Sequence, residues 1–363
     1  MKVGILGGGQ LGRMLALAGY PLGLTFRFFD PNPESPAGQI GELITASYDD
    51  EGALRGFASD LDVATFEFES VPRAAADVVS RFAPVRPDAA ALAATQDRLA
   101  ERELLESVGI RVAPYAAVSS GEELSAAAGM LGYPLILKAR RLGYDGKGQV
   151  RLEADSDLAE AWQSIGARPA IVERVVEFTR ELSVLAVRAP EGSIAAYPLI
   201  ENHHSTGILR FSFAPAAGTE RLQPEAEAIA RAVAEALNYV GVLAIELFET
   251  DEGLVANEIA PRVHNSGHWT MDGAETSQFE NHLRAILGMP LGSTSAIGYS
   301  GMVNILGSIP ELRRLLAIPG AHVHLYGKSA SHRRKLGHVN VRAESASLVK
   351  EAVGEIRRAM AAS

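Results

Sequence analysis

The first 30 residues set the strongest constraint on the fold, because they place an apolar strand, a glycine turn and a helix in succession. We predict a short buried strand over residues 3–6 and a helix over 11–19, joined by a turn of the pattern G-x-G-x-x-G. The glycines of this turn are Gly7, Gly9 and Gly12. A second strand over 24–29 ends at Asp30, roughly where an acid binds ribose in dinucleotide-binding folds. Two interpretations stay open, a phosphate site at the helix N-terminus or a turn kept for packing.

The remainder of the chain is predicted to form further α/β units. Strands and helices alternate up to about residue 95, which indicates a small parallel α/β domain. A charged helix over 95–109 then leads into a second unit of strands around a glycine-rich turn. We therefore expect an α/β fold with three domains, over residues 1–95, 96–190 and 191–363.

Composition restricts the partners of such a fold. The formal net charge of −10 argues against nucleic acid, whose phosphates require clustered Lys and Arg. The absence of cysteine excludes disulfides, thiolate zinc sites and cysteine nucleophiles. No run of 18 apolar residues predicts a membrane span, and Gln10 and Arg13 interrupt the apolar N-terminus. We expect a cytoplasmic protein without a signal peptide that binds small molecules.

Two apolar strands near residue 250 each carry a single acid. The segments VLAIELF and LVANEIA contain Glu246 and Glu258, and a turn centred on residues 251–253 would place these two side chains opposite each other, about 5 Å apart. A solvated sheet edge would explain such a pair, but the neighbouring residues are apolar. Burial of unpaired carboxylates is costly, and a divalent cation removes that cost. The pattern favours a magnesium site, which usually brings nucleotide phosphates with it.

Two further features agree with a nucleotide. Lys138 lies in the apolar strand YPLILKAR, where its burial without an anion would be costly. The loop GYDGKGQ over 143–149 offers backbone amides and Lys147, but it does not open a helix, and no Walker A pattern occurs. Each feature alone also fits a lysine that reaches solvent or a plain hairpin turn. Together with the paired glutamates, they indicate phosphates covered by a lid.

The order of these elements resembles the ATP-grasp superfamily over essentially the whole chain. Within it, the segments GGGQLGRM, TFEFE, GYDGKGQ, ENHHSTGIL and above all NEIAPRVHNSGHWT are similar to the 5-(carboxyamino)imidazole ribonucleotide synthase family. The resemblance implies an N-terminal Rossmann-like domain over 1–95, a linker helix and lid over 96–190, and a C-terminal ATP-grasp α+β domain over 191–363. It also implies that the glycine turn helps to form the ribonucleotide site and binds no NAD.

The resemblance carries an activity with it. It implies an ATP-dependent ligase of purine biosynthesis that carboxylates 5-aminoimidazole ribonucleotide with bicarbonate, through carboxyphosphate. Mg²⁺, or Mn²⁺ in its place, would accompany ATP. It further implies a homodimer whose product passes to a carboxyaminoimidazole ribonucleotide mutase.

The family pattern also assigns site residues. The positions that match ATP-binding residues are Arg98, Lys138, Gly143, Tyr144, Asp145, Gly146, Lys147, Gly148, Gln149, Glu173, Arg174, Val175, Val176, Glu181, His204, Asn257 and Glu258. The metal ligands are Glu246 and Glu258. The catalytic positions are Asp145, Arg262, His264 and Asn265. The substrate-binding positions are Gln10, Tyr144, Lys147, Ser266, Lys328 and Arg334.

Three choices stay open within this assignment. Glu67 or Glu69 contacts the imidazole, His203 or His204 fills the histidine position, and Asp145 or His264 relays the proton.

Other interpretations of these segments are weaker. His264 and His268 could bind zinc from a helix, but the Asn-Ser-Gly between them argues against one. The segment HRRKLGH over 332–338 fits either a solvated basic face or one phosphate monoester. Trp162 and Trp269 are expected to be packing residues. Another ATP-grasp carboxylase or transformylase is the nearest alternative function, and an NAD-dependent oxidoreductase is a more distant one.

Overall fold

The N-terminal segment forms a four-stranded parallel sheet in a computed structural model, which describes residues 1–141 and 148–361. The strand order is β3-β2-β1-β4. The strands are β1 (Lys2–Leu6), β2 (Thr25–Phe29), β3 (Glu42–Ile44) and β4 (Val63–Phe66). The helices here are α1 (Gln10–Gly19), α2 (Glu51–Ala58), α3 (Arg73–Val79) and α4 (Ala89–Gln96), with short 3-10 turns at Tyr20–Leu22 and Pro36–Gln39. The predicted parallel α/β arrangement is confirmed.

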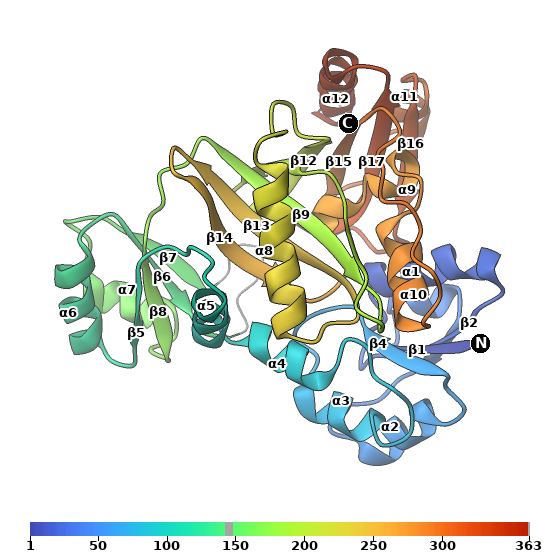
Figure 1. The fold of residues 1–363 in the computed structure, drawn as a ribbon, viewed down its shortest axis with the longest axis horizontal. Coiled ribbons are helices and arrows are strands. Elements are labelled where there is room, and N and C mark those ends of the chain that lie inside the picture. The colour runs from blue at the N-terminus through green and yellow to red at the C-terminus, as the bar shows by residue number, and fades with distance from the viewer. Residues whose placement is uncertain (142–147, 362–363) are drawn as a thin grey trace.

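A second, antiparallel sheet forms the lobe at the left of Figure 1. Its order is β5-β8-β6-β7, from the strands β5 (Tyr115–Val118), β6 (Leu135–Ala139), β7 (Gln149–Leu152) and β8 (Ala170–Arg174). The helices α6 (Gly121–Leu131) and α7 (Leu158–Ser164) pack on it around a core of its own, to which Trp162 belongs. Because this core is separate from the other clusters, the lobe is a distinct packing unit.

The largest sheet runs in the order β14-β13-β9-β11-β12-β15-β17-β16, with β10 paired to β9. Its strands are β9 (Arg180–Arg188), β10 (Ile194–Ala196), β11 (Ile200–Ser205), β12 (Ile208–Ala214), β13 (Gly241–Thr250), β14 (Gly253–Ala260), β15 (Tyr299–Leu306), β16 (Ala321–Leu325) and β17 (Lys335–Ala343). The helices of this part are α5 (Arg98–Ser107), α8 (Gln223–Ala236), α9 (Thr270–Gly273), α10 (Gln278–Ile286), α11 (Leu312–Leu316) and α12 (Ala346–Ala361), with a 3-10 turn at Asn265–Gly267. The predicted boundary at residue 190 separates β9 from the strands with which it pairs, and the three-way division stays a prediction.

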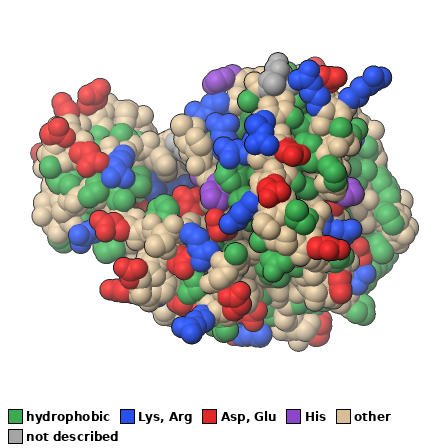
Figure 2. Space-filling view, turned by 90° about the horizontal axis from the view of Figure 1, so that it is seen from above, with side chains coloured by type: hydrophobic (Ala, Val, Ile, Leu, Met, Phe, Trp, Pro, Cys, Tyr) green, Lys and Arg blue, Asp and Glu red, His purple; other side chains and the backbone are tan. Residues whose placement is uncertain are grey.

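The N-terminal sheet is fused to the large sheet, whereas the lobe with β5–β8 stands apart. One hydrophobic cluster contains residues of α1, α10 and β13, together with Trp269, which confirms both tryptophans as packing residues. Figure 2 shows a hollow between the smaller lobe and the main body. The helix α5 lies between the smaller lobe and the hairpin β13–β14 in Figure 1, and it contacts β14. In the described ranges, no helix is long and apolar enough to cross a membrane.

Candidate active site

The hairpin β13–β14 places Glu246 directly opposite Glu258, as predicted. The turn is shorter than expected, since Thr250 pairs with Gly253 and only two residues lie between them. If this pairing register continued along the hairpin without a break, Glu246 would lie opposite Asn257. A β-bulge leaves Asn257 unpaired and moves the register by one residue, which brings the two carboxylates to the same rung.

Burial of the Glu246 side chain, only 17% exposed, raises its pKa to about 7, and the charge of Glu258 adds to the effect. The Glu258 side chain is 39% exposed and lies 3.3 Å from Arg98. Two oxygen donors that resist being charged together are stabilised by a bound cation. This chemistry fits Mg²⁺ or Mn²⁺, although among the described residues no group of three or more His, Cys, Asp or Glu side chains gathers around one point.

Lys138, on β6, is buried, as its apolar neighbours predicted. Its Nζ forms an ion pair with Glu173 at the end of β8, and burial lowers the lysine pKa although Glu173 opposes the change. Gln149 pairs with Lys138 across β6 and β7, and Gly148 accepts a backbone hydrogen bond from Ala139. This part of the predicted ATP site is therefore assembled next to the lobe boundary.

The helix α5 contributes two buried charges that the sequence analysis did not assign. Arg102 donates to Glu173 Oε1 at 2.6 Å and to Glu101 Oε2 at 3.1 Å. Glu101 in turn accepts from the backbone N–H of Ile259 at 2.6 Å, one residue beyond Glu258. The signal in the sequence is the i, i+3, i+4 spacing of Arg98, Glu101 and Arg102, which places all three on one helix face.

His204 is the histidine that faces the glutamates. It forms an ion pair with Glu181, and although burial lowers its pKa, Glu181 and Glu246 together raise it above the ordinary value. His203 instead bonds Glu201 at 2.9 Å and stacks on Phe211. The two neighbouring histidines therefore have different partners, and the choice of His204 for the ATP site stays a prediction.

The predicted catalytic positions after β14 lie next to Glu246 and Glu258. Arg262 forms an ion pair with Glu69, and Nε2 of His264 lies 3.6 Å from Glu246 Oε1. Burial alone would raise the pKa of Glu69, but Arg262 outweighs it and holds the pKa at about 2. Asn265 is buried, and neither of its amide atoms has a hydrogen-bond partner within residues 1–141 and 148–361.

Ser266 is expected to contact substrate, and this role stays a prediction. It is fully buried in the 3-10 turn Asn265–Gly267, where its hydroxyl bonds Ser183 and Nδ1 of His264, both at 2.9 Å. Because this turn packs against the large sheet, Ser266 supports the His264 ring instead of facing the lobe boundary. His268 is equally buried and lies against Phe279 and His338.

The glycine turn is occupied by protein carboxylates. Glu67 accepts from Gly9 N at 2.5 Å and from Gly12 N at 2.9 Å, and Asp30 accepts from Gly8 N at 2.7 Å. These are the amides that would bind the pyrophosphate of a dinucleotide. The structure therefore favours the packing interpretation of the turn. Glu67 caps α1, whereas Glu69 reaches Arg262.

The predicted ribonucleotide positions meet between the N-terminal and C-terminal parts. Lys328 donates to Gln10 Oε1 at 2.6 Å, although these residues are 318 positions apart in the chain. Arg334 bonds Ser329 Oγ at 3.0 Å. Lys328 and Arg334 line one cavity of about 640 Å³, together with residues of the segment 33–45. Both cations thus face one pocket, as a shared phosphate site requires.

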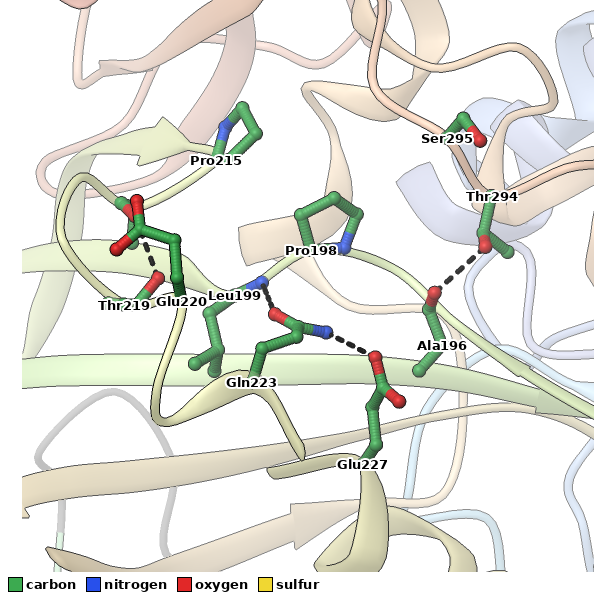
Figure 3. A pocket seen from close by; sticks show the side chains of 11 residues that line it. Ala196, Pro198, Leu199, Pro215, Thr219, Glu220, Gln223, Glu227, Thr294 and Ser295 are labelled. Carbon is green, nitrogen blue, oxygen red and sulfur yellow. Dashed lines mark hydrogen bonds between the residues drawn. The ribbon is translucent and has the colours of Figure 1, made fainter. Parts of the chain in front are cut away.

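A second cavity, of about 340 Å³, lies elsewhere (Figure 3). It is lined by Pro198, Pro215 and the start of α8, and Gln223 there is already bonded to Leu199 N and Glu227. None of the predicted site residues lines it.

The other predicted positions are distributed as follows. Arg174, Val175 and Val176 lie where β8 ends, and the amides of Arg174 and Val175 donate to Pro114 and Pro134. The predicted lid positions outside the described residues are Gly143, Tyr144, Asp145, Gly146 and Lys147.

Comparisons with known proteins agree with this architecture. The family models that match are the ribonucleotide synthetase preATP-grasp domain (residues 1–96), the ATP-grasp domain (103–279) and the phosphoribosylaminoimidazole carboxylase C-terminal domain (300–352). Fold and site together define an ATP-grasp enzyme. The chain is 48% identical to the N5-carboxyaminoimidazole ribonucleotide synthase of Pseudomonas aeruginosa, over 98% of both chains, and 46% identical to that of Brucella melitensis, over 93% and 95%. It belongs to the N5-carboxyaminoimidazole ribonucleotide synthase family.

Solved structures give the same result. The synthetase of Thermus thermophilus superposes with a TM-score of 0.94 at 50% identity, covering 98% of both chains. The synthase of Aspergillus clavatus in complex with ADP and 5-aminoimidazole ribonucleotide superposes with a TM-score of 0.90 at 33% identity, again over 98% of both. The expected ATP-grasp fold is confirmed.

Proposed function

We propose that this protein is an ATP-dependent ligase that carboxylates the amine of 5-aminoimidazole ribonucleotide with bicarbonate, giving N5-carboxyaminoimidazole ribonucleotide in purine biosynthesis. The observation that carries the proposal is the convergence of Glu246, Glu258, Lys138 and Arg262 on one lobe boundary, in a chain of this family. These groups would bind the cation, bind phosphate and stabilise the anion that is transferred.

We assign ATP to the boundary between the lobe and the hairpin. Lys138 and Arg98 neutralise phosphate charge, the segment at the end of β8 contributes to ATP binding, and Glu181 and His204 lie on the body side. Glu246 and Glu258, with Asn257 beside them, would hold Mg²⁺ or Mn²⁺. The cation, when bound, offsets phosphate charge during phosphoryl transfer.

The carboxylation is a two-step reaction. Bicarbonate oxygen attacks the γ-phosphorus of ATP, which forms carboxyphosphate and releases ADP; the amine nitrogen of the ribonucleotide then forms the C–N bond as phosphate leaves and one amine proton is lost. Arg262, anchored by Glu69, stabilises the carboxylate and phosphate charge. The amide of Asn265, which has no hydrogen-bond partner among the described residues, is available to orient the same anion.

The tautomer of His264 decides whether this ring can accept the proton that the amine loses. Ser266 N–H donates to Nδ1 of His264 at 3.3 Å, and burial lowers the pKa of this imidazole well below its usual range, so the neutral ring carries its hydrogen on Nε2. His264 is therefore a donor toward the anion. We assign the role of proton acceptor to Asp145 on this ground.

We place the ribonucleotide phosphate in the cavity lined by Lys328 and Arg334, with Gln10 beside it. Tyr144 and Lys147 are proposed to complete the substrate site. On the family resemblance, we also propose a homodimer located in the cytoplasm, whose product passes to a carboxyaminoimidazole ribonucleotide mutase. Sedimentation equilibrium tests the dimer.

The decisive experiment incubates the purified protein with ATP, Mg²⁺, bicarbonate and 5-aminoimidazole ribonucleotide, and measures ADP and carboxylated product in parallel. We expect a one-to-one ratio, and a large loss of ATP binding in Lys138→Ala by isothermal titration. Replacing bicarbonate by formate, or the ribonucleotide by another acceptor, separates this activity from those of other ATP-grasp enzymes. Tight NAD binding without ATP binding would overturn the proposal.

A further inference from the structure

A series of buried charges of alternating sign runs from the lobe to the hairpin, and two of its members lie on one face of α5. Its members, in order, are Lys138, Glu173, Arg102, Glu101 and the N–H of Ile259. The Arg102 side chain is 1% exposed, that of Glu101 3% and that of Glu173 4%. This series of charges differs from an isolated surface ion pair, because each side chain has been removed from water. Each of them therefore needs its neighbours to compensate its buried charge.

Glu173 divides its two carboxylate oxygens between two cations. Oε1 accepts from Arg102 at 2.6 Å, and Oε2 is paired with Lys138. A lysine that turns its ammonium toward an ATP phosphate weakens its hold on Glu173. Without a second cation, the carboxylate would remain as a buried, unpaired charge, and this cost would oppose the movement of Lys138.

We infer that Arg102 is a positioning residue for ATP binding: it holds Glu173 in place while Lys138 exchanges that carboxylate for the nucleotide phosphate. The inference rests on the proposed role of Lys138. Through Glu101, the same arginine is connected to the backbone beside Glu258, so that one helix sets the phosphate-binding lysine and the metal-binding hairpin relative to each other.

The test measures ATP affinity by isothermal titration in Arg102→Met. We expect affinity to fall about ten- to hundredfold, the effect of one lost hydrogen bond between charged groups. In this variant, Lys138 is the one cation among the described residues that still pairs with Glu173. Binding of 5-aminoimidazole ribonucleotide should stay unchanged. Arg151→Met is the matched control, because Arg151 lies on the neighbouring β7 and its ion pair with Glu153 is exposed.

A second substitution separates positioning from a general structural role. In a Glu173→Gln background, which lacks the carboxylate that retains Lys138, Arg102→Met should cause little further loss of ATP affinity. The reference for this comparison is Glu173→Gln alone, because Glu173 is itself a predicted ATP-binding position. If Arg102→Met does not fold, Arg102→Gln, alone and with Glu173→Gln, provides the same comparison. Wild-type affinity in Arg102→Met, or an equal loss on adding Arg102→Met in both backgrounds, overturns the inference. Should Lys138→Met itself leave ATP affinity unchanged, the proposed function of Lys138 fails instead.

Discussion

The opposed carboxylates of the hairpin predict a stability effect whose sign depends on pH. Glu246 has an ordinary pKa of 4.5, which the fold raises to about 7. An acid with a raised pKa in the folded state destabilises the fold once it ionises, so stability falls as the pH rises from about 4.5 through 7. At about 1.4 kcal/mol per pKa unit, the total is about 3 kcal/mol.

Glu258→Gln removes part of this cost. Burial is the larger cause of the raised pKa, and the charge of Glu258 is the second. Of the total destabilisation, Glu258 therefore accounts for on the order of 1 kcal/mol. The variant also loses the half-exposed ion pair with Arg98, worth at most about 1 kcal/mol at either pH. When the pH is raised from 5 to 8 without divalent cations, the free energy of unfolding of Glu258→Gln should therefore rise by about 1 kcal/mol relative to that of the wild type.

Thermal unfolding in EDTA at the two pH values measures this gain, which corresponds to about 2–4 °C in relative midpoint for a domain of about 200 residues. Glu252→Gln, at the exposed hairpin turn, controls for the loss of one charge. In a Glu246→Gln background, the pH-dependent gain should disappear. A Glu258→Gln midpoint that differs from wild type by the same amount at pH 5 and pH 8 would refute the reasoning.

Three further predictions concern other parts of the protein. Lys328→Ala and Arg334→Ala should each weaken ribonucleotide binding about ten- to hundredfold by titration and leave ATP affinity unchanged, because each removes one charge-assisted contact; unchanged ribonucleotide affinity would place the phosphate elsewhere. Glu67→Ala should cost about 1–2 kcal/mol in urea unfolding, as expected for the loss of a helix cap, and an unaltered midpoint would contradict the capping role. Glu69→Gln should release more ADP than product in the coupled assay, because it loosens Arg262; a retained one-to-one ratio would argue against that anchor.

The features that could be predicted from the sequence are local ones. Strand alternation and a short turn were sufficient to set Glu246 against Glu258, because hairpin partners lie close together in the chain. The bulge at Asn257 could not be foreseen. The expected turn was one residue longer than the observed turn, and the bulge compensates for this difference, so that Glu246 still lies opposite Glu258. The burial of Lys138 likewise followed from its apolar neighbours on the same strand.

The features that the sequence did not reveal depend on distant contacts. Arg102 meets Glu173 across 71 positions, and Arg262 meets Glu69 across 193. In the sequence, α5 looks like a solvated charged helix, because nothing local shows that a lobe and a hairpin cover the same face. The burial of Ser266 was not foreseen for a related reason: a motif fixes the order of residues, but only the fold decides which side of a turn is buried.

The carboxylate of Glu67 within the glycine turn changes what that turn contributes. A helix start whose amides are already bonded to the protein is a rigid support and not a receptor for anions. Gln10, the first residue of α1, is thereby held where its side chain meets Lys328. A Cβ at position 9 would lie 2.2 Å from Glu67 Oε1, so even alanine there would displace the carboxylate from the amides at the start of α1 and remove the support next to Gln10.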